Sequence, residues 1–138
     1  MRRHPRIDPL AWASIAFVAA MLLHGADHIR QGTGSLTHEV FWGGVVLAVA
    51  GFSTVPLALR RNPRAPLYCA AVGLWAVLGV SASHLAPHWS AFSNPYPELS
   101  VDALSWAAML TEVVAGGVLA AIGIRELRAG APPHPAQA

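Results

Sequence analysis

The stretch Val101–Ile124, VDALSWAAMLTEVVAGGVLAAIGI, is long and apolar, and only Asp102 and Glu112 in it are acidic. A helix needs about 20 apolar residues to cross the hydrocarbon core of a bilayer. Three further stretches of this kind precede it: Leu10–Ile29, Val40–Leu59 and Ala65–Leu85. Backbone polar groups in lipid must be hydrogen-bonded within the segment, so each stretch is predicted to be a membrane-spanning helix.

The connections between these stretches are short, which favours antiparallel neighbours. They are Arg30–Glu39, Arg60–Arg64 and Ala86–Ser100. The fold is therefore predicted to be all-α, with an integral-membrane, antiparallel four-helix bundle over residues 10–128. Residues 1–9 form a basic N-terminal segment, and the proline-rich residues 129–138 are predicted to be a disordered tail.

The composition agrees with a membrane protein. Charged residues make up 12% of the 138-residue chain, against roughly 25% in soluble domains. Intrinsic disorder and a nucleic-acid-binding role are excluded by this composition, so no nucleic-acid partner is expected. Cys69 is the single cysteine, so an internal disulfide is excluded as well.

Arginines mark one side of the predicted bundle. All nine basic residues are arginines, and eight of them share one side if four helices cross the membrane. The eight are Arg2, Arg3, Arg6, Arg60, Arg61, Arg64, Arg125 and Arg128. Because cytoplasmic loops are enriched in positive residues, both termini are predicted to be cytoplasmic. The chain is expected to be a multi-pass cell-membrane protein, and its lysine-free, Ala- and Arg-rich composition indicates a bacterial plasma membrane.

The first stretch also has the basic start and apolar run of a signal peptide. Its apolar region continues to Ile29, however, and its end carries His24, Asp27 and His28. We therefore expect it to be retained as a membrane helix.

Histidines and acids gather on the predicted extracytoplasmic side. Five of the seven histidines lie there. A polar group inside the membrane is costly unless it faces the bundle interior, so this concentration indicates a binding site. The predicted metal ligands are His24, His28, His84, His88, Asp27, His38 and Asp102.

His24 and His28 are four residues apart and so share one helix face. This spacing brings two imidazoles within reach of one metal ion, as in helical zinc sites. Asp27 is either a third ligand or the hydrogen-bond acceptor for a liganding imidazole.

His84 and His88 repeat this spacing, but Pro87 lies between them. Proline disfavours helix at the residue before it, so this helix is predicted to end near His84. His38 and Glu39 are adjacent and point in different directions, so one of them at most is expected to face the site.

Glu112 lies eleven residues past Val101, which places it about 16 Å along the helix and near the bilayer centre. A charged group there costs on the order of 3 kcal/mol. Glu112 is therefore expected to be protonated, paired with a polar group or part of a proton path. It belongs to a helical stripe that is predicted to face the bundle interior: Asp102, Ser105, Trp106, Met109, Glu112 and Gly116. Gly116 and Gly117 permit close helix approach.

The ligand types leave zinc, copper and iron open as the metal. Cys69 lies near the opposite end of its helix, which argues against a thiolate-held Cu(I) or an iron–sulfur cluster. A b-type haem is the alternative cofactor, with His24 and His84 as its axial ligands and Arg30 beside a propionate.

Three hypotheses of function follow. The first is a membrane protein with a His/carboxylate transition-metal site that binds, handles or performs redox chemistry on the metal. The second is a haem-b electron-transfer subunit. The third is a non-catalytic accessory subunit or small permease-like oligomer with a proton-linked Glu112. Four helices make a thin bundle, so a homo-oligomer or larger membrane complex is expected. The sequence leaves open whether the chain is an enzyme.

Overall fold

The computed structural model describes residues 8–32, 34 and 36–130. This part of the chain contains five helices and no strands. Four helices are long and apolar enough to cross a membrane: α1 (Pro9–Gln31), α2 (His38–Leu59), α3 (Ala65–His84) and α5 (Ala103–Gly130). Between α3 and α5 lies α4 (Tyr96–Leu99), a single turn. The prediction of an all-α chain with four long apolar helices is confirmed.

Local sequence explains where the helices begin and end. Asp8 accepts a hydrogen bond from the Leu10 N–H at 3.0 Å and caps α1, with Pro9 in the first helical position. Thr37 caps α2 through the Val40 N–H at 3.2 Å. The third helix ends at His84, as the position of Pro87 predicts.

The last helix begins later and ends later than the stretch 101–124. Asp102 Oδ1 accepts a hydrogen bond from the Ser105 N–H at 3.0 Å, so this residue precedes α5 as its cap. Beyond Ile124, good helix formers such as Arg125, Glu126 and Leu127 continue the helix to Gly130. The remaining residues of the predicted tail, 131–138, lie outside the described part, as do Arg2, Arg3 and Arg6.

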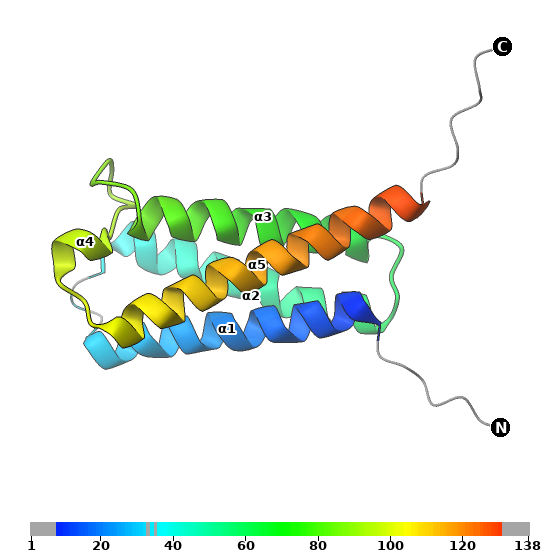
Figure 1. Ribbon diagram of the computed structural model, residues 1–138, viewed down its shortest axis with the longest axis horizontal. Coiled ribbons are helices and arrows are strands. Elements are labelled where there is room, and N and C mark those ends of the chain that lie inside the picture. The colour runs from blue at the N-terminus through cyan, green and yellow to red at the C-terminus, as the bar shows by residue number, and fades with distance from the viewer. Residues whose placement is uncertain (1–7, 33, 35, 131–138) are drawn as a thin grey trace, which may run out of the picture.

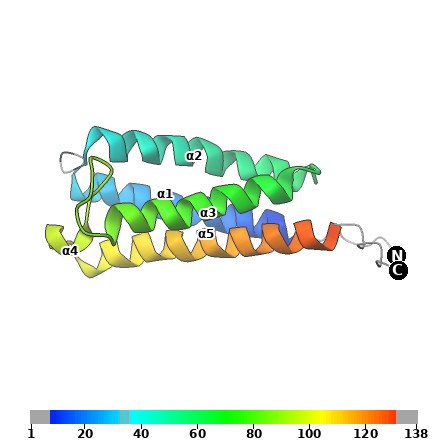
Figure 2. The same ribbon diagram turned by 90° about the horizontal axis from the view of Figure 1, so that it is seen from above.

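Figures 1 and 2 show how the helices are arranged. The end of α1, the start of α2, the end of α3 and the start of α5 lie at one end of the molecule, beside α4. We call this the α4 end. The fifth helix packs against α3 and α1, whereas α2 packs more loosely against α1 and α3. The helix termini that carry the polar residues of interest therefore meet at the α4 end.

Glycines allow α3 and α5 to approach closely. A Cβ atom at Gly73 would lie 2.5 Å from the Gly116 carbonyl oxygen, and one at Gly123 would lie 2.6 Å from the Pro66 oxygen. A Cβ atom at Gly117 would meet its nearest neighbour, Val77, at an ordinary 3.8 Å. Of the two glycines expected to permit close approach, Gly116 lies at the contact and Gly117 lies beside it.

We expect Gly123→Ala to lower the melting temperature in detergent by about 5 °C, because the added methyl group overpacks the contact between α3 and α5. The matched control is Gly117→Ala in the same helix, which gains the same helix propensity without a clash. Circular dichroism melting curves measure both. Equal melting temperatures for the two variants would contradict the close approach.

Candidate metal centre

Three histidines from two helices meet at the α4 end. His24 and His28 lie one turn apart on α1, and His84 is the last residue of α3. The ring centroids are 4.6 Å apart for His24 and His28, 5.1 Å for His24 and His84, and 5.4 Å for His28 and His84. Each residue offers one nitrogen, and these atoms all lie within 4.8 Å of one another. Among the described residues this is the one group of three or more His, Cys, Asp or Glu side chains with such geometry.

These distances suit a metal ion. Zinc–imidazole bonds measure about 2.0–2.1 Å, so nitrogens around a tetrahedral ion lie about 3.4 Å apart. The three nitrogens would have to approach one another by rotation of the rings about their side-chain bonds to reach that spacing. His24 and His84 are buried and His28 is half-buried, so the cluster is largely shielded from solvent.

Glu112 orients the His24 imidazole. Its Oε2 atom lies 2.5 Å from His24 Nδ1, and both side chains are buried. With Glu112 as the acceptor of this hydrogen bond, Nδ1 carries the proton and Nε2 keeps a lone pair for a ligand. The Glu112 side chain is buried in the bundle, and its polar partner there is His24.

The loop before α5 orients the other buried imidazole. His84 Nδ1 donates to the Asn94 carbonyl oxygen at 3.0 Å, which leaves Nε2 of His84 with its lone pair. The Asn94 N–H in turn donates to the Ser83 carbonyl at 2.8 Å, so the loop is tied to the end of α3.

Tyr96 completes the enclosure of the histidines. Its ring packs on His84 with centroids 4.5 Å apart, and its hydroxyl lies 3.2 Å from His24 Nε2. Burial raises the pKa of Tyr96 to about 12, so the phenol keeps its proton at neutral pH and can donate to this nitrogen. A metal ion on His24 Nε2 therefore has to displace the Tyr96 hydroxyl.

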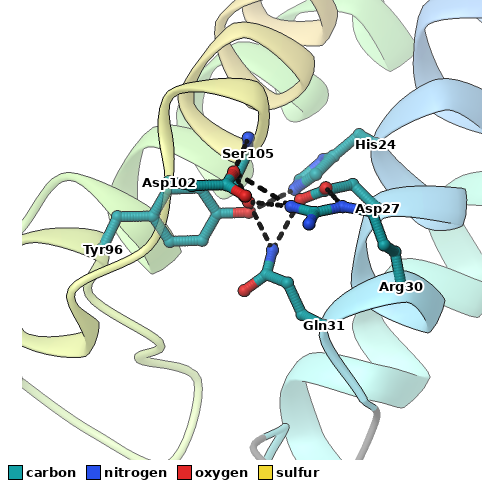
Figure 3. Close-up of polar contacts among 7 residues, drawn as sticks. All are labelled: His24, Asp27, Arg30, Gln31, Tyr96, Asp102 and Ser105. Carbon is teal, nitrogen blue, oxygen red and sulfur yellow. Dashed lines mark hydrogen bonds and ion pairs between the residues drawn. The ribbon is translucent and has the colours of Figure 1, made fainter.

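A second polar network lies beside the histidines and links the end of α1 to the start of α5 (Figure 3). Arg30 donates to Asp27 at 2.8 Å and to Asp102 at 2.9 Å. Gln31 donates to Asp27 at 2.5 Å and to the Ser105 hydroxyl at 2.9 Å. The Ser105 backbone N–H, its hydroxyl and Arg30 hold the pKa of Asp102 below its usual value. This network fixes the helix that carries His24 and His28.

The structure brings together three of the seven predicted ligands: His24, His28 and His84. The carboxylates of Asp27 and Asp102 contact Arg30 instead, and neither belongs to the three-histidine group. His38, at the start of α2, and His88, in the loop, are exposed and also lie outside the group.

Sequence reasoning missed Tyr96 and the Asn94 carbonyl. Both come from the segment between α3 and α5, which contains the single turn α4, and one turn is too short for helical spacing to predict a face. The available signal was composition, because this segment is rich in prolines and aromatic residues. Gln31 was also missed, although it lies four residues after Asp27 and so shares its helix face.

A cavity of about 700 Å³ opens beside the three histidines. Its walls come from α1, the first half of α2, the second half of α3 and the loop that follows α3. The loop contributes Trp89 and Phe92, and α5 contributes Glu112. His24, His28 and His84 all line it. A metal ion held by the histidines would therefore have a coordination position facing open space.

Comparisons with protein-family models, curated proteins and solved structures found no match to this chain.

We expect Glu112→Leu to destabilise the protein by about 1–3 kcal/mol, because it leaves the buried His24 N–H without an acceptor. The double variant His24→Leu/Glu112→Leu removes both partners and is expected to recover much of this loss. Denaturant or thermal unfolding in detergent measures the stability of the wild type, the two single variants and the double variant. Strictly additive losses would contradict a direct interaction between the two side chains.

Proposed function

We propose that this chain is a multi-pass membrane protein that binds one divalent transition-metal ion through His24, His28 and His84. The convergence of the three imidazoles carries the proposal. Metal-ligating histidines usually donate their second ring N–H to a carboxylate or a backbone carbonyl. Glu112 supplies the first kind of acceptor, for His24, and Asn94 supplies the second, for His84.

Imidazole ligands suit zinc, copper and iron, and all three stay within the proposal. Three protein ligands with an open position are typical of sites where the metal meets water or a substrate, whereas structural zinc sites are closed by four protein ligands. The cavity beside the histidines supports the open arrangement. The proposed role is therefore metal-dependent binding, handling or redox chemistry.

The packing of the histidines favours a directly bound ion over haem b. The rings of His24 and His84 lie edge to face with centroids 5.1 Å apart. Axial ligands of one haem must lie on opposite sides of the porphyrin plane, and this contact leaves no layer for it. Arg30, the expected propionate partner, already pairs with Asp27 and Asp102.

We further propose that the four long helices form an antiparallel bundle with both termini in the cytoplasm, so that the histidines lie near the extracytoplasmic surface. The arginine distribution supports this orientation, with Arg60, Arg61 and Arg64 in the turn between α2 and α3. We also propose that the protein lies in a bacterial plasma membrane and assembles into a homo-oligomer or a larger membrane complex.

Metal binding is tested on detergent-purified protein that has been stripped with a chelator. We expect isothermal titration with Zn²⁺, Cu²⁺ or Fe²⁺, followed by elemental analysis, to give one ion per chain for at least one metal. His28→Ala should weaken its affinity at least about 100-fold, because it removes one of three ligands.

His38→Ala is the matched control, since this histidine is exposed and outside the group, and its affinity should equal that of the wild type. An absorption spectrum of protein purified without chelator separates the alternatives. A Soret band would support haem b. Absence of stoichiometric binding for all three metals would refute the metal site.

Orientation is tested by cysteine labelling of intact cells in a Cys69→Ala background. Ala91→Cys, in the exposed loop after α3, should react with a membrane-impermeant maleimide. Pro63→Cys, in the exposed turn between α2 and α3, should react only after the cells are lysed. The reverse pattern would show that the bundle is inverted.

A further inference from the structure

We propose that the cavity beside the three histidines binds a lipid-soluble molecule whose hydroxyl-type head group occupies the open position on the ion. The inference rests on the metal site proposed above and names the ligand class of that site. By hydroxyl-type we mean an alcohol, a phenol or a hydroxamic acid.

The walls of the cavity define the apolar part of this ligand. They include Met21, Leu22, Val45, Leu47, Trp75 and Val80. Ligand pockets in proteins measure about 300–1,000 Å³ and are mostly apolar with a few polar groups that fix orientation. The cavity of about 700 Å³ matches this size, and its lining combines apolar side chains with the three grouped histidines.

The loose packing of α2 gives the ligand its route. The buried residues of α2 are Leu47, Gly51, Thr54 and Ala58, so none lies in its first nine residues. Gly43 and Gly44 line the cavity, and a Cβ atom at either would meet nothing within 4 Å. Leu22 and Phe41 in the walls are 53% and 45% exposed. In a bilayer such side chains face acyl chains, so entry is sideways from the lipid.

The charges around the cavity define the head group. Three neutral imidazoles leave the +2 charge of a divalent ion uncompensated, and such an ion can accept a hydroxyl oxygen in its open position. Among the residues that the structure describes, the lining contains no Lys or Arg, and it does contain Glu39 and Glu112. A head group that brings a proton and little negative charge therefore suits the site better than a phosphate.

Hydroxamic acids with different tails test the proposal on Co²⁺-loaded protein, whose visible spectrum changes when a ligand joins the metal. We compare octanohydroxamic acid with acetohydroxamic acid, which has the same head group and no long tail. Each buried methylene contributes roughly a fourfold gain in affinity. We expect the octano compound to bind about 100-fold more tightly, which allows for incomplete burial of the six extra methylenes.

The variant Gly44→Leu tests whether the tail of the octano compound lies in the cavity or in the detergent. A Cβ atom at Gly44 meets nothing within 4 Å, so a leucine there can occupy part of the cavity. The ratio of the two affinities should therefore fall at least about fivefold while Co²⁺ affinity is unchanged. The matched control is Gly130→Leu at the end of α5, where a Cβ atom also meets nothing and the ratio should stay at the wild-type value.

The other outcomes would refute either the ligand site alone or the ligand site together with the metal site. Equal affinities for the two hydroxamic acids, or a ratio that Gly44→Leu leaves unchanged, would refute the cavity as a ligand site while the metal site stands. Failure of Co²⁺ to bind, with Zn²⁺, Cu²⁺ and Fe²⁺ also failing, would refute the metal site and the ligand site together.

Discussion

The hydrogen bond between His24 and Glu112 is the interaction on which the site depends, because it joins two costly polar groups inside an apolar bundle. A charged side chain at the bilayer centre costs on the order of 3 kcal/mol. A hydrogen bond to a charged group returns about 1.5–3 kcal/mol. Each residue is therefore tolerated largely because the other is present. The same hydrogen bond joins α1 to α5. It also directs Nε2 of His24 away from Glu112 and toward the Tyr96 hydroxyl.

The helices differ in how tightly they are held, and this difference shapes the site. Gly73, Gly116 and Gly123 let α3 and α5 meet at backbone distance, while the network around Arg30 ties the end of α1 to the start of α5. These contacts hold the helices that supply all three histidines. The remaining long helix, α2, has no buried residue among its first nine, so a cavity opens on its side of the histidines. A fixed ligand set beside an open wall is the arrangement that a metal site needs if it is to meet another molecule.

Much of this architecture could be predicted from residue spacing. Four apolar stretches predict the four long helices, Pro87 predicts the end of α3, and the spacing of His24 and His28 predicts that they lie together. Spacing within a helix cannot show which residue of another helix arrives beside it, so the contacts of His84 with His24 and His28 required the structure. The same limit applies to Asp27 and Asp102, whose positions suggest metal ligands until Arg30 is seen between them. Tyr96 begins α4, a single turn that is too short for residue spacing to predict which face points to the histidines.

X-ray absorption spectroscopy of the metal-loaded protein tests the central claim, which is that three imidazoles hold one ion. The account predicts a first shell of nitrogen or oxygen atoms at about 2.0–2.1 Å for zinc, with outer-shell scattering from three imidazole rings. In His28→Ala the imidazole contribution should fall to two rings. A sulfur ligand, or outer-shell scattering that His28→Ala leaves unchanged, would contradict it.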